Sequence, residues 1–134
     1  MIRKEEEPVV ERLRATCIVA TPADLDQLGQ AEGGVRLRTA PDELLLIGER
    51  ATPPVIADPH AIIFTETGLV GSWMPVEQAL EILARTCEWE RPANRPACAQ
   101  GMVAGLPVRL WLEPERILFV TAAPFAADLA ERLR

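Results

Sequence analysis

Short apolar runs separated by proline and glycine constrain this chain more than any other feature of its sequence. Runs at 15–20, 44–47, 62–65 and 117–120 are rich in aliphatic and β-branched side chains and are too short for typical buried helices. The chain contains 12 prolines and 8 glycines, many of them between such runs. The sequence therefore predicts several short strands joined by turns.

Two of these strands have a helix signal close by. After the strand at 15–20, Thr21 can cap a helix with its hydroxyl and Pro22 fits the first helical position, where no N–H is needed. We expect this helix to end at Gly29. We also expect that the N-terminal arm could include a short helix over 8–14.

Helical spacing is clearest after Pro75. One apolar stripe repeats every three or four residues, and it comprises Val76, Ala79, Leu80, Leu83 and Cys87. A last helix is predicted from about Pro124, because three apolar side chains follow at intervals of four: Phe125, Leu129 and Leu133. It should lie on the sheet formed by the strands that precede it.

The strands group into two sets. Alternation at 35–38, a turn at 41–43 and the aliphatic run that follows predict a hairpin. Runs at 98–103, 106–112 and 117–120, joined by short turns, predict an antiparallel meander. The predicted fold class is α+β, with two strand-and-helix units and largely antiparallel sheets.

The length of 134 residues suits a single domain over 1–134, which would bury roughly two-thirds of the surface of its unfolded chain. Within it, we expect a charged arm at 1–14. The segment 49–60 carries Pro53, Pro54 and Pro59, so few N–H donors are available for a sheet. We expect that segment to be an exposed connection between the two halves.

Charge and hydropathy exclude several classes of partner. The net charge is -6 and the pI is about 4.8, whereas binding to phosphate backbones needs a positive face. No apolar run approaches the roughly 18 residues of a membrane span, and no apolar segment of a secretory signal follows the charged N-terminus. The sequence predicts a cytoplasmic protein without nucleic-acid or membrane partners.

Catalytic groups are few. The single histidine, His60, lies in a predicted loop beside no evident nucleophile, and Ser72 lacks the flanking glycines of a nucleophile elbow. Cys17, Cys87 and Cys98 lack the close spacing of a zinc site, and their apolar neighbours predict buried thiols. No glycine-rich loop matches a dinucleotide or phosphate cradle. We therefore predict no catalytic, cofactor-binding or metal-binding residues.

Tryptophan indicates where a partner would dock. Trp111 alternates with Leu110 and Leu112, so Trp111 and Arg109 should point away from the face that these leucines bury. Either a second layer or an interface would explain an outward tryptophan. Trp and Arg are enriched at interface hot spots, so Arg109, Trp111 and Trp73 are the predicted interface residues. In the alternative, the C-terminal helix covers Trp111 and sets Phe125 and Leu129 against it.

The order of these features resembles the gamma subunit of heterotetrameric sarcosine oxidase, a family related to the folate-binding fold of aminomethyltransferases. The chain is similar to a divergent member of that family. The resemblance lies in a proline and an acidic residue followed by aliphatics, a helix that ends in cysteine, and the final strands and helix, at 40–46, 79–87, 98–111, 117–120 and 125–129.

The resemblance implies a non-catalytic structural subunit of a flavin-dependent complex that oxidises sarcosine-like amines. Flavin and NAD would belong to larger subunits, and this chain would pack against the alpha-type subunit. The isolated chain could also form homo-oligomers. The main rival is a stand-alone domain that keeps a folate-type small-molecule pocket. A third hypothesis, an independent enzyme, would need a base such as His60 and a nucleophile that the sequence does not show.

Overall fold

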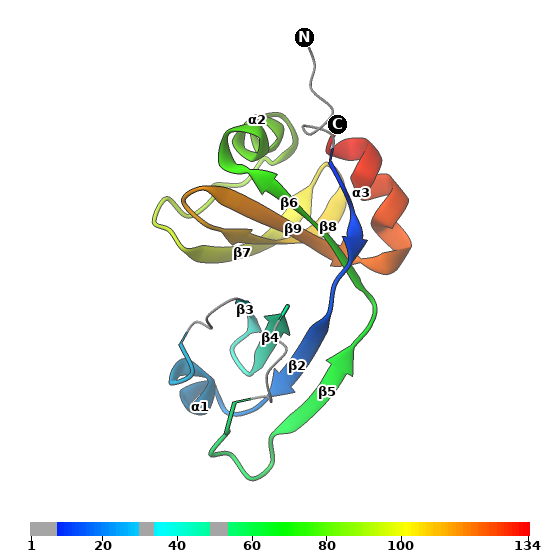
Figure 1. Cartoon of the computed structure of the whole chain (residues 1–134). Coiled ribbons are helices and arrows are strands. Elements are labelled where there is room, and N and C mark those ends of the chain that lie inside the picture. Colours follow the sequence, from blue (N-terminus) through cyan, green and yellow to red (C-terminus); the bar gives the residue numbers. More distant parts are fainter. Residues whose placement is uncertain (1–7, 30–33, 49–53) are drawn as a thin grey trace. The chain divides into compact units, whose positions relative to one another are not determined.

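The computed structural model describes residues 8–29, 34–48 and 54–134, which form two compact units (Figure 1). One contains a five-stranded sheet and is called here the five-stranded unit (residues 8–12 and 68–134). The other contains a four-stranded sheet and is called the four-stranded unit (the described residues within 13–67). Both sheets are antiparallel and a few helices accompany them, so the fold is α+β, as predicted.

The five-stranded sheet has the strand order β1-β6-β9-β8-β7. Its strands are β1 (Glu11–Arg12), β6 (Leu69–Pro75), β9 (Arg116–Ala122), β8 (Leu106–Leu112) and β7 (Ala97–Val103). The last three strands in the chain, β7, β8 and β9, are neighbours in the sheet and form the predicted antiparallel meander.

Helices cover one face of this sheet (Figure 1). They are α2 (Val76–Thr86), the 3-10 turn η2 (Ala123–Phe125) and α3 (Ala126–Arg132). Buried residues of α2 and the C-terminal segment pack with the inward side chains of the strands, including Leu83, Leu129, Leu110, Leu112 and Phe119. The apolar stripes that predicted both helices are therefore the sides that contact the core.

The four-stranded sheet has the order β3-β4-β2-β5. Its strands are β3 (Val35–Ala40), β4 (Glu43–Ile47), β2 (Ala15–Val19) and β5 (Ile62–Glu66). The short helix α1 (Pro22–Asp26) contributes Leu25 to a small core with Ile18, Leu44 and Leu46. The predicted hairpin over 35–48 is confirmed as β3 and β4.

Both sheets contain strands that are apolar on two faces. Leu44, Leu45, Leu46 and Ile47 are all buried, as are the four residues of the run at 117–120. Side chains alternate between the faces of a strand, so continuous runs of this kind require cover on both sides. This explains why the sequence has unbroken aliphatic runs where a half-exposed sheet would alternate.

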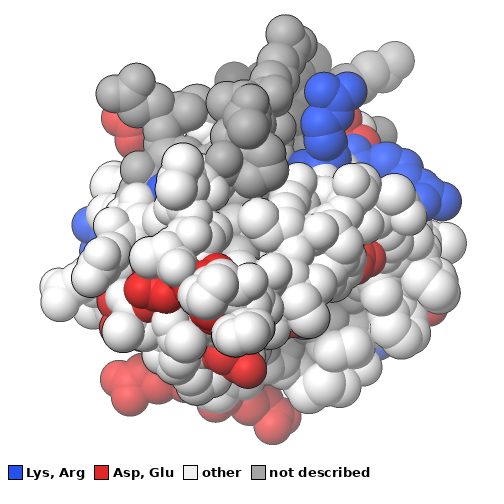
Figure 2. All heavy atoms as spheres, turned by 90° about the horizontal axis from the view of Figure 1, so that it is seen from below, with Lys and Arg blue, Asp and Glu red and all other residues white. Residues whose placement is uncertain are grey.

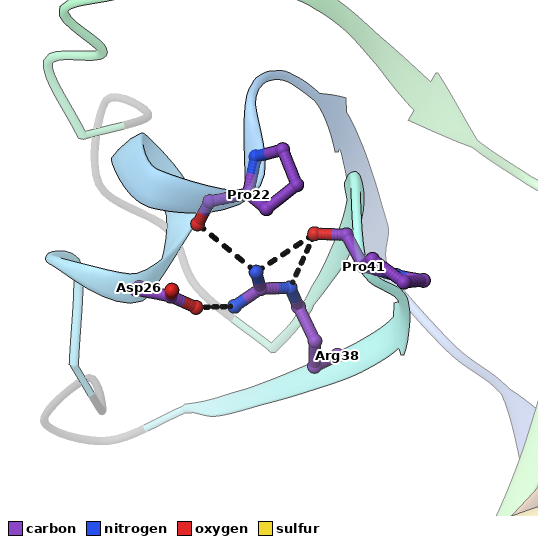
Figure 3. A network of polar contacts seen from close by, with 4 residues as sticks. All are labelled: Pro22, Asp26, Arg38 and Pro41. Carbon is purple, nitrogen blue, oxygen red and sulfur yellow. Dashed lines mark hydrogen bonds and ion pairs between the residues drawn. The ribbon is translucent and has the colours of Figure 1, made fainter.

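Arg38 ties the short helix to its sheet (Figure 3). Its guanidinium donates to the carbonyl oxygens of Pro22, at 3.1 Å, and Pro41, at 2.7 and 3.0 Å. It also pairs with Asp26, with 2.8 Å between Nη1 and Oδ1. Because a helix of five residues is far below the length that is stable alone in water, these contacts and Leu25 are what position it.

Two sequence-based expectations about local structure were wrong, and one strand was not predicted. No helix forms over 8–14, where the described residues include β1, paired with β6. Strand β6, which begins at Leu69 and contains Gly71, was not predicted, and its cross-strand pairing with β9 outweighs the weak strand propensity of glycine. Thr21 makes no side-chain cap bond; instead its backbone N–H donates to Asp58 Oδ2 at 3.1 Å.

The connection predicted over 49–60 lies partly outside the described residues. Its described part runs from Pro54 and leads into β5, so it belongs to the four-stranded unit. The two units are divided instead after Arg12 and after Thr67. The prediction of one domain over 1–134 stays a prediction.

Uncharged surface is extensive. On the side of the molecule shown in Figure 2, much of the described surface carries neither acidic nor basic side chains. In the part of the chain that the structure describes, no helix is long and apolar enough to cross a membrane.

Candidate functional site

The candidate site lies on the face of the five-stranded sheet opposite its helices, called here the Arg109 face. Strand register creates it: Trp73 pairs with Leu118, Leu118 with Trp111, and Trp111 with Cys98. One row along, Gly71, Val120, Arg109 and Gln100 follow the same order. The structure therefore brings the three predicted interface residues, Arg109, Trp111 and Trp73, onto one face.

A polar network links the two tryptophans. Arg116 lies over the ring of Trp73, with 3.7 Å between the guanidinium carbon and the ring centroid. Its Nε donates to Glu113 Oε1 at 2.8 Å, and the indole N–H of Trp111 donates to Glu113 Oε2, also at 2.8 Å. Glu113 thus accepts from both neighbours, and the polar atom of a buried tryptophan is satisfied.

The three predicted residues differ in exposure. Trp111 is only 6% exposed, whereas Trp73 and Arg109 are half-buried. The alternative in which the C-terminal helix covers Trp111 is wrong. Leu129 of α3 packs with Leu110 and Leu112, the leucines that alternate with Trp111 and point to the opposite face.

A hollow of about 360 Å³ opens beside Arg109. It is lined by residues of β6, β7, β8 and β9 only, and its wall is mainly apolar, with Leu69, Met102, Pro107, Val120 and Ala122. Arg109 is its one charged lining residue among the described residues. Gln100, its cross-strand partner, adds an amide.

Sequence reasoning missed Gln100, Met102, Glu113 and Arg116. Period-two alternation could have placed Gln100 and Met102 on one face of β7, as it did for Arg109 and Trp111 on β8. The Glu113–Arg116 pair spans the turn at Pro114 at a separation of three residues. The stacking of Arg116 on Trp73 depends on the pairing of β6 with β9, which the local sequence does not encode.

Of the groups considered for catalysis, one belongs to the four-stranded unit and one is buried in the five-stranded unit. His60 is exposed in the four-stranded unit, and its backbone N–H donates to Asp58 Oδ1 at 2.9 Å. Ser72 is 1% exposed, and among the described residues its hydroxyl has no hydrogen-bond partner. Because Ser72 is paired with Phe119 on the helix side of the sheet, its hydroxyl cannot reach a substrate in this conformation.

One of the three cysteine thiols is exposed, although all three were predicted to be buried. None of the three cysteines, all within the described residues, forms a disulfide; Cys17 is buried and Cys87 half-buried, but Cys98 is exposed. It lies on β7, the strand at the edge of the sheet, so its apolar neighbours in sequence do not cover it. Within the described residues, no group of three or more His, Cys, Asp or Glu side chains could hold a metal ion.

Comparison with known proteins shows the fold. No family model and no curated protein matches the chain. Seven chains of solved structures match it. One belongs to heterotetrameric sarcosine oxidase from Corynebacterium sp. U-96 in complex with pyrrole 2-carboxylate, with a TM-score of 0.74 and 16% identity. The match covers 98% of this chain and 84% of that chain, so nearly all of this chain shares the fold of that one.

Proposed function

We propose that this chain is a gamma-type structural subunit of a flavin-dependent, amine-oxidising complex like heterotetrameric sarcosine oxidase. The supporting observation is the likeness to a chain of such a heterotetramer across 98% of the residues here. A chain that matches 84% of a subunit over nearly all of its own residues is better suited to an equivalent place in an assembly than to a fragment of an unrelated enzyme.

In this proposal the chain performs no chemistry itself. Its single histidine is exposed on a loop, and Ser72 is buried away from solvent. The sequence has no glycine-rich phosphate cradle. Flavin and NAD would therefore be held by larger subunits, and this chain would contribute contact surface to the alpha-type subunit.

Co-purification from the native cell tests this proposal. An affinity-tagged chain should retain larger subunits at a fixed stoichiometry, with flavin absorbance and sarcosine-dependent electron transfer in the same fraction. Recovery of the chain alone, or with partners that lack flavin, would overturn the proposal. Mass spectrometry of the bound chains and the visible spectrum of the eluate supply the two readouts.

Trp73 is the best site to test the predicted interface. It is half-buried and stacked by Arg116, whereas Trp111 offers little accessible surface. As an interface residue, Trp73→Ala should weaken retention of the larger subunit by about 2 kcal/mol with little change in the thermal midpoint. A large fall in the midpoint with unchanged retention would remove Trp73 from the interface.

A stand-alone folate-type binding domain is the second candidate, and the hollow beside Arg109 is the observation that favours it. Calorimetric titration with tetrahydrofolate separates the two. The structural-subunit proposal expects no heat of binding by the isolated chain. Saturation at micromolar concentrations would favour the binding domain.

A further inference from the structure

Arg109 differs from most arginines in the described part of the chain. Six others donate to a carbonyl or carboxylate oxygen, and these are Arg36, Arg38, Arg85, Arg95, Arg116 and Arg132. Arg109 is half-buried, and its guanidinium has no hydrogen bond or ion pair within the described residues. A partly desolvated cation without a counter-charge is unfavourable, so an anion would be stabilised beside it.

The surroundings of Arg109 limit what that anion can be. The wall of the hollow is mainly aliphatic, from Leu69, Pro107 and Val120, and Met102 at its edge is 55% exposed and flexible. A phosphate dianion would leave one charge uncompensated in this apolar setting, since Arg109 is the only lining cation. A single carboxylate matches the planar guanidinium and can accept two hydrogen bonds from it.

We propose that the hollow binds a small molecule that carries one carboxylate on an apolar body. Arg109 would hold the carboxylate, with Gln100 beside it. The apolar body would lie on Pro107 and Ala122, which line the hollow and keep accessible surface, and Met102 would adapt to its shape. The volume of about 360 Å³ is near the lower end of the range for ligand pockets, which favours a compact ligand.

This site is independent of the proposed subunit role, because ligand binding is measured on the isolated full chain. A carboxylate could also come from a Glu or Asp side chain of a larger subunit, which shares the same chemistry. Free ligand added to the isolated chain and retention of the larger subunit therefore have to be measured separately on the same Arg109 variant.

Amide-resolved NMR titration with hexanoate, compared with the uncharged hexanamide, tests the proposal. Hexanoate should shift the amides of residues 69, 100–102, 109 and 120 with a saturable curve. Hexanamide, with the same carbon chain and no charge, should bind at least about tenfold more weakly. Arg109→Met should remove that difference.

Arg91→Met is the matched control. Arg91 is also half-buried and has no partner among the described residues, but it lies outside the lining of the hollow. Its replacement removes the same charge and should leave the hexanoate titration unchanged. If Arg109→Met does not fold, the comparison of hexanoate with hexanamide on the unaltered chain still decides the matter.

Three results would overturn the site. Hexanoate and hexanamide could shift the same amides equally, hexanoate could cause no saturable shift, or Arg91→Met could weaken binding as much as Arg109→Met. Loss of the larger subunit by Arg109→Met, when hexanoate does not bind the unaltered chain, would assign Arg109 to a protein interface instead.

Discussion

The five-stranded unit buries its sheet under two helices, whereas the four-stranded unit has a single described helix of five residues. In the first, thirteen buried residues form one core cluster. Among the described residues of the second, the corresponding cluster contains five: Ile18, Ala20, Leu25, Leu44 and Leu46. Its edge strand β5 exposes large apolar side chains, with Ile62, Ile63 and Phe64 at 59%, 44% and 43%.

Strands with similar apolar sequences therefore contribute differently to the stability of the two units. Apolar side chains of β9 supply stability because both faces of the strand are covered. Those of β5 supply much less, because water still reaches them. An open edge with exposed apolar side chains is also where another chain can pair, a hazard that proteins usually limit. We expect local stability to fall from β9 toward β5.

The largest expected effect compares two phenylalanines. Phe119 is fully buried in β9, and Phe64 is 43% exposed in β5. Phe119→Ala should lower the free energy of unfolding by about 3–5 kcal/mol, and Phe64→Ala by less than about 1 kcal/mol. Urea unfolding followed by circular dichroism gives both values.

Tryptophan fluorescence reports the unfolding of the five-stranded unit, because Trp73, Trp89 and Trp111 all belong to it. Phe119→Ala should lower the fluorescence midpoint, and Phe64→Ala should leave it close to the original value. Equal losses for the two variants would contradict the comparison between the covered and the open strand.

A smaller effect is expected at two glycines that are required for different reasons. A Cβ at Gly101 would lie 2.7 Å from ring atoms of Trp89, whose indole N–H donates to the Met102 carbonyl at 2.8 Å. Gly101→Ala should therefore cost about 1–3 kcal/mol through overpacking. Gly48 of the four-stranded unit has open space around it and a φ of +80°, so Gly48→Ala should cost about 1 kcal/mol through backbone strain.

A double-mutant cycle separates overpacking at Gly101 from backbone strain at Gly48. With Trp89→Ala present, Gly101→Ala should cost little, because the clashing ring is gone, whereas the cost of Gly48→Ala should not change. The unfolding free energies of the single and double variants provide the measurement. An unchanged cost for Gly101→Ala in the Trp89→Ala background would mean that the ring is not what restricts the site.

Local patterns predicted most elements because they depend on spacing within a few residues. The stripe after Pro75 and the alternation in β8 survived folding, so the helix α2 and the shared face of Arg109 and Trp111 could be foreseen. Strand β6 was missed because Gly68 precedes it and Gly71 and Pro75 lie within it. Its pairing with β9, which joins residues about fifty apart in sequence, stabilises it.

The candidate site was only half predictable for the same reason. Alternation gives the direction of a side chain but not what lies across the strand or what covers it. The row from Trp73 to Cys98 and the hollow beside Arg109 both require four strands in register. Exposure of Cys98 likewise follows from the position of β7 at the sheet edge, which neighbouring residues do not specify.

The smallest expected effect tests how the four-stranded unit holds its short helix without a large core. Asp26 is 68% exposed, so its ion pair with Arg38 should be weak. Asp26→Asn should lower the free energy of unfolding by less than about 0.5 kcal/mol at low salt and by no measurable amount at high salt. Arg38→Met also removes hydrogen bonds to the Pro22 and Pro41 carbonyls. Arg38→Met should lower the free energy of unfolding by about 1 kcal/mol, and this loss should persist in high salt.

Hydrogen exchange at the Leu25 amide, which donates to the Thr21 carbonyl, reports the local stability of α1. Faster exchange in Arg38→Met than in Asp26→Asn, at low and high salt alike, is the expected result. It would mean that backbone carbonyls anchor α1 and that the four-stranded unit uses polar contacts where the five-stranded unit uses apolar cover. Equal effects that both vanish in salt would instead make the exposed ion pair the anchor, and the contrast between the units would rest on β5 alone.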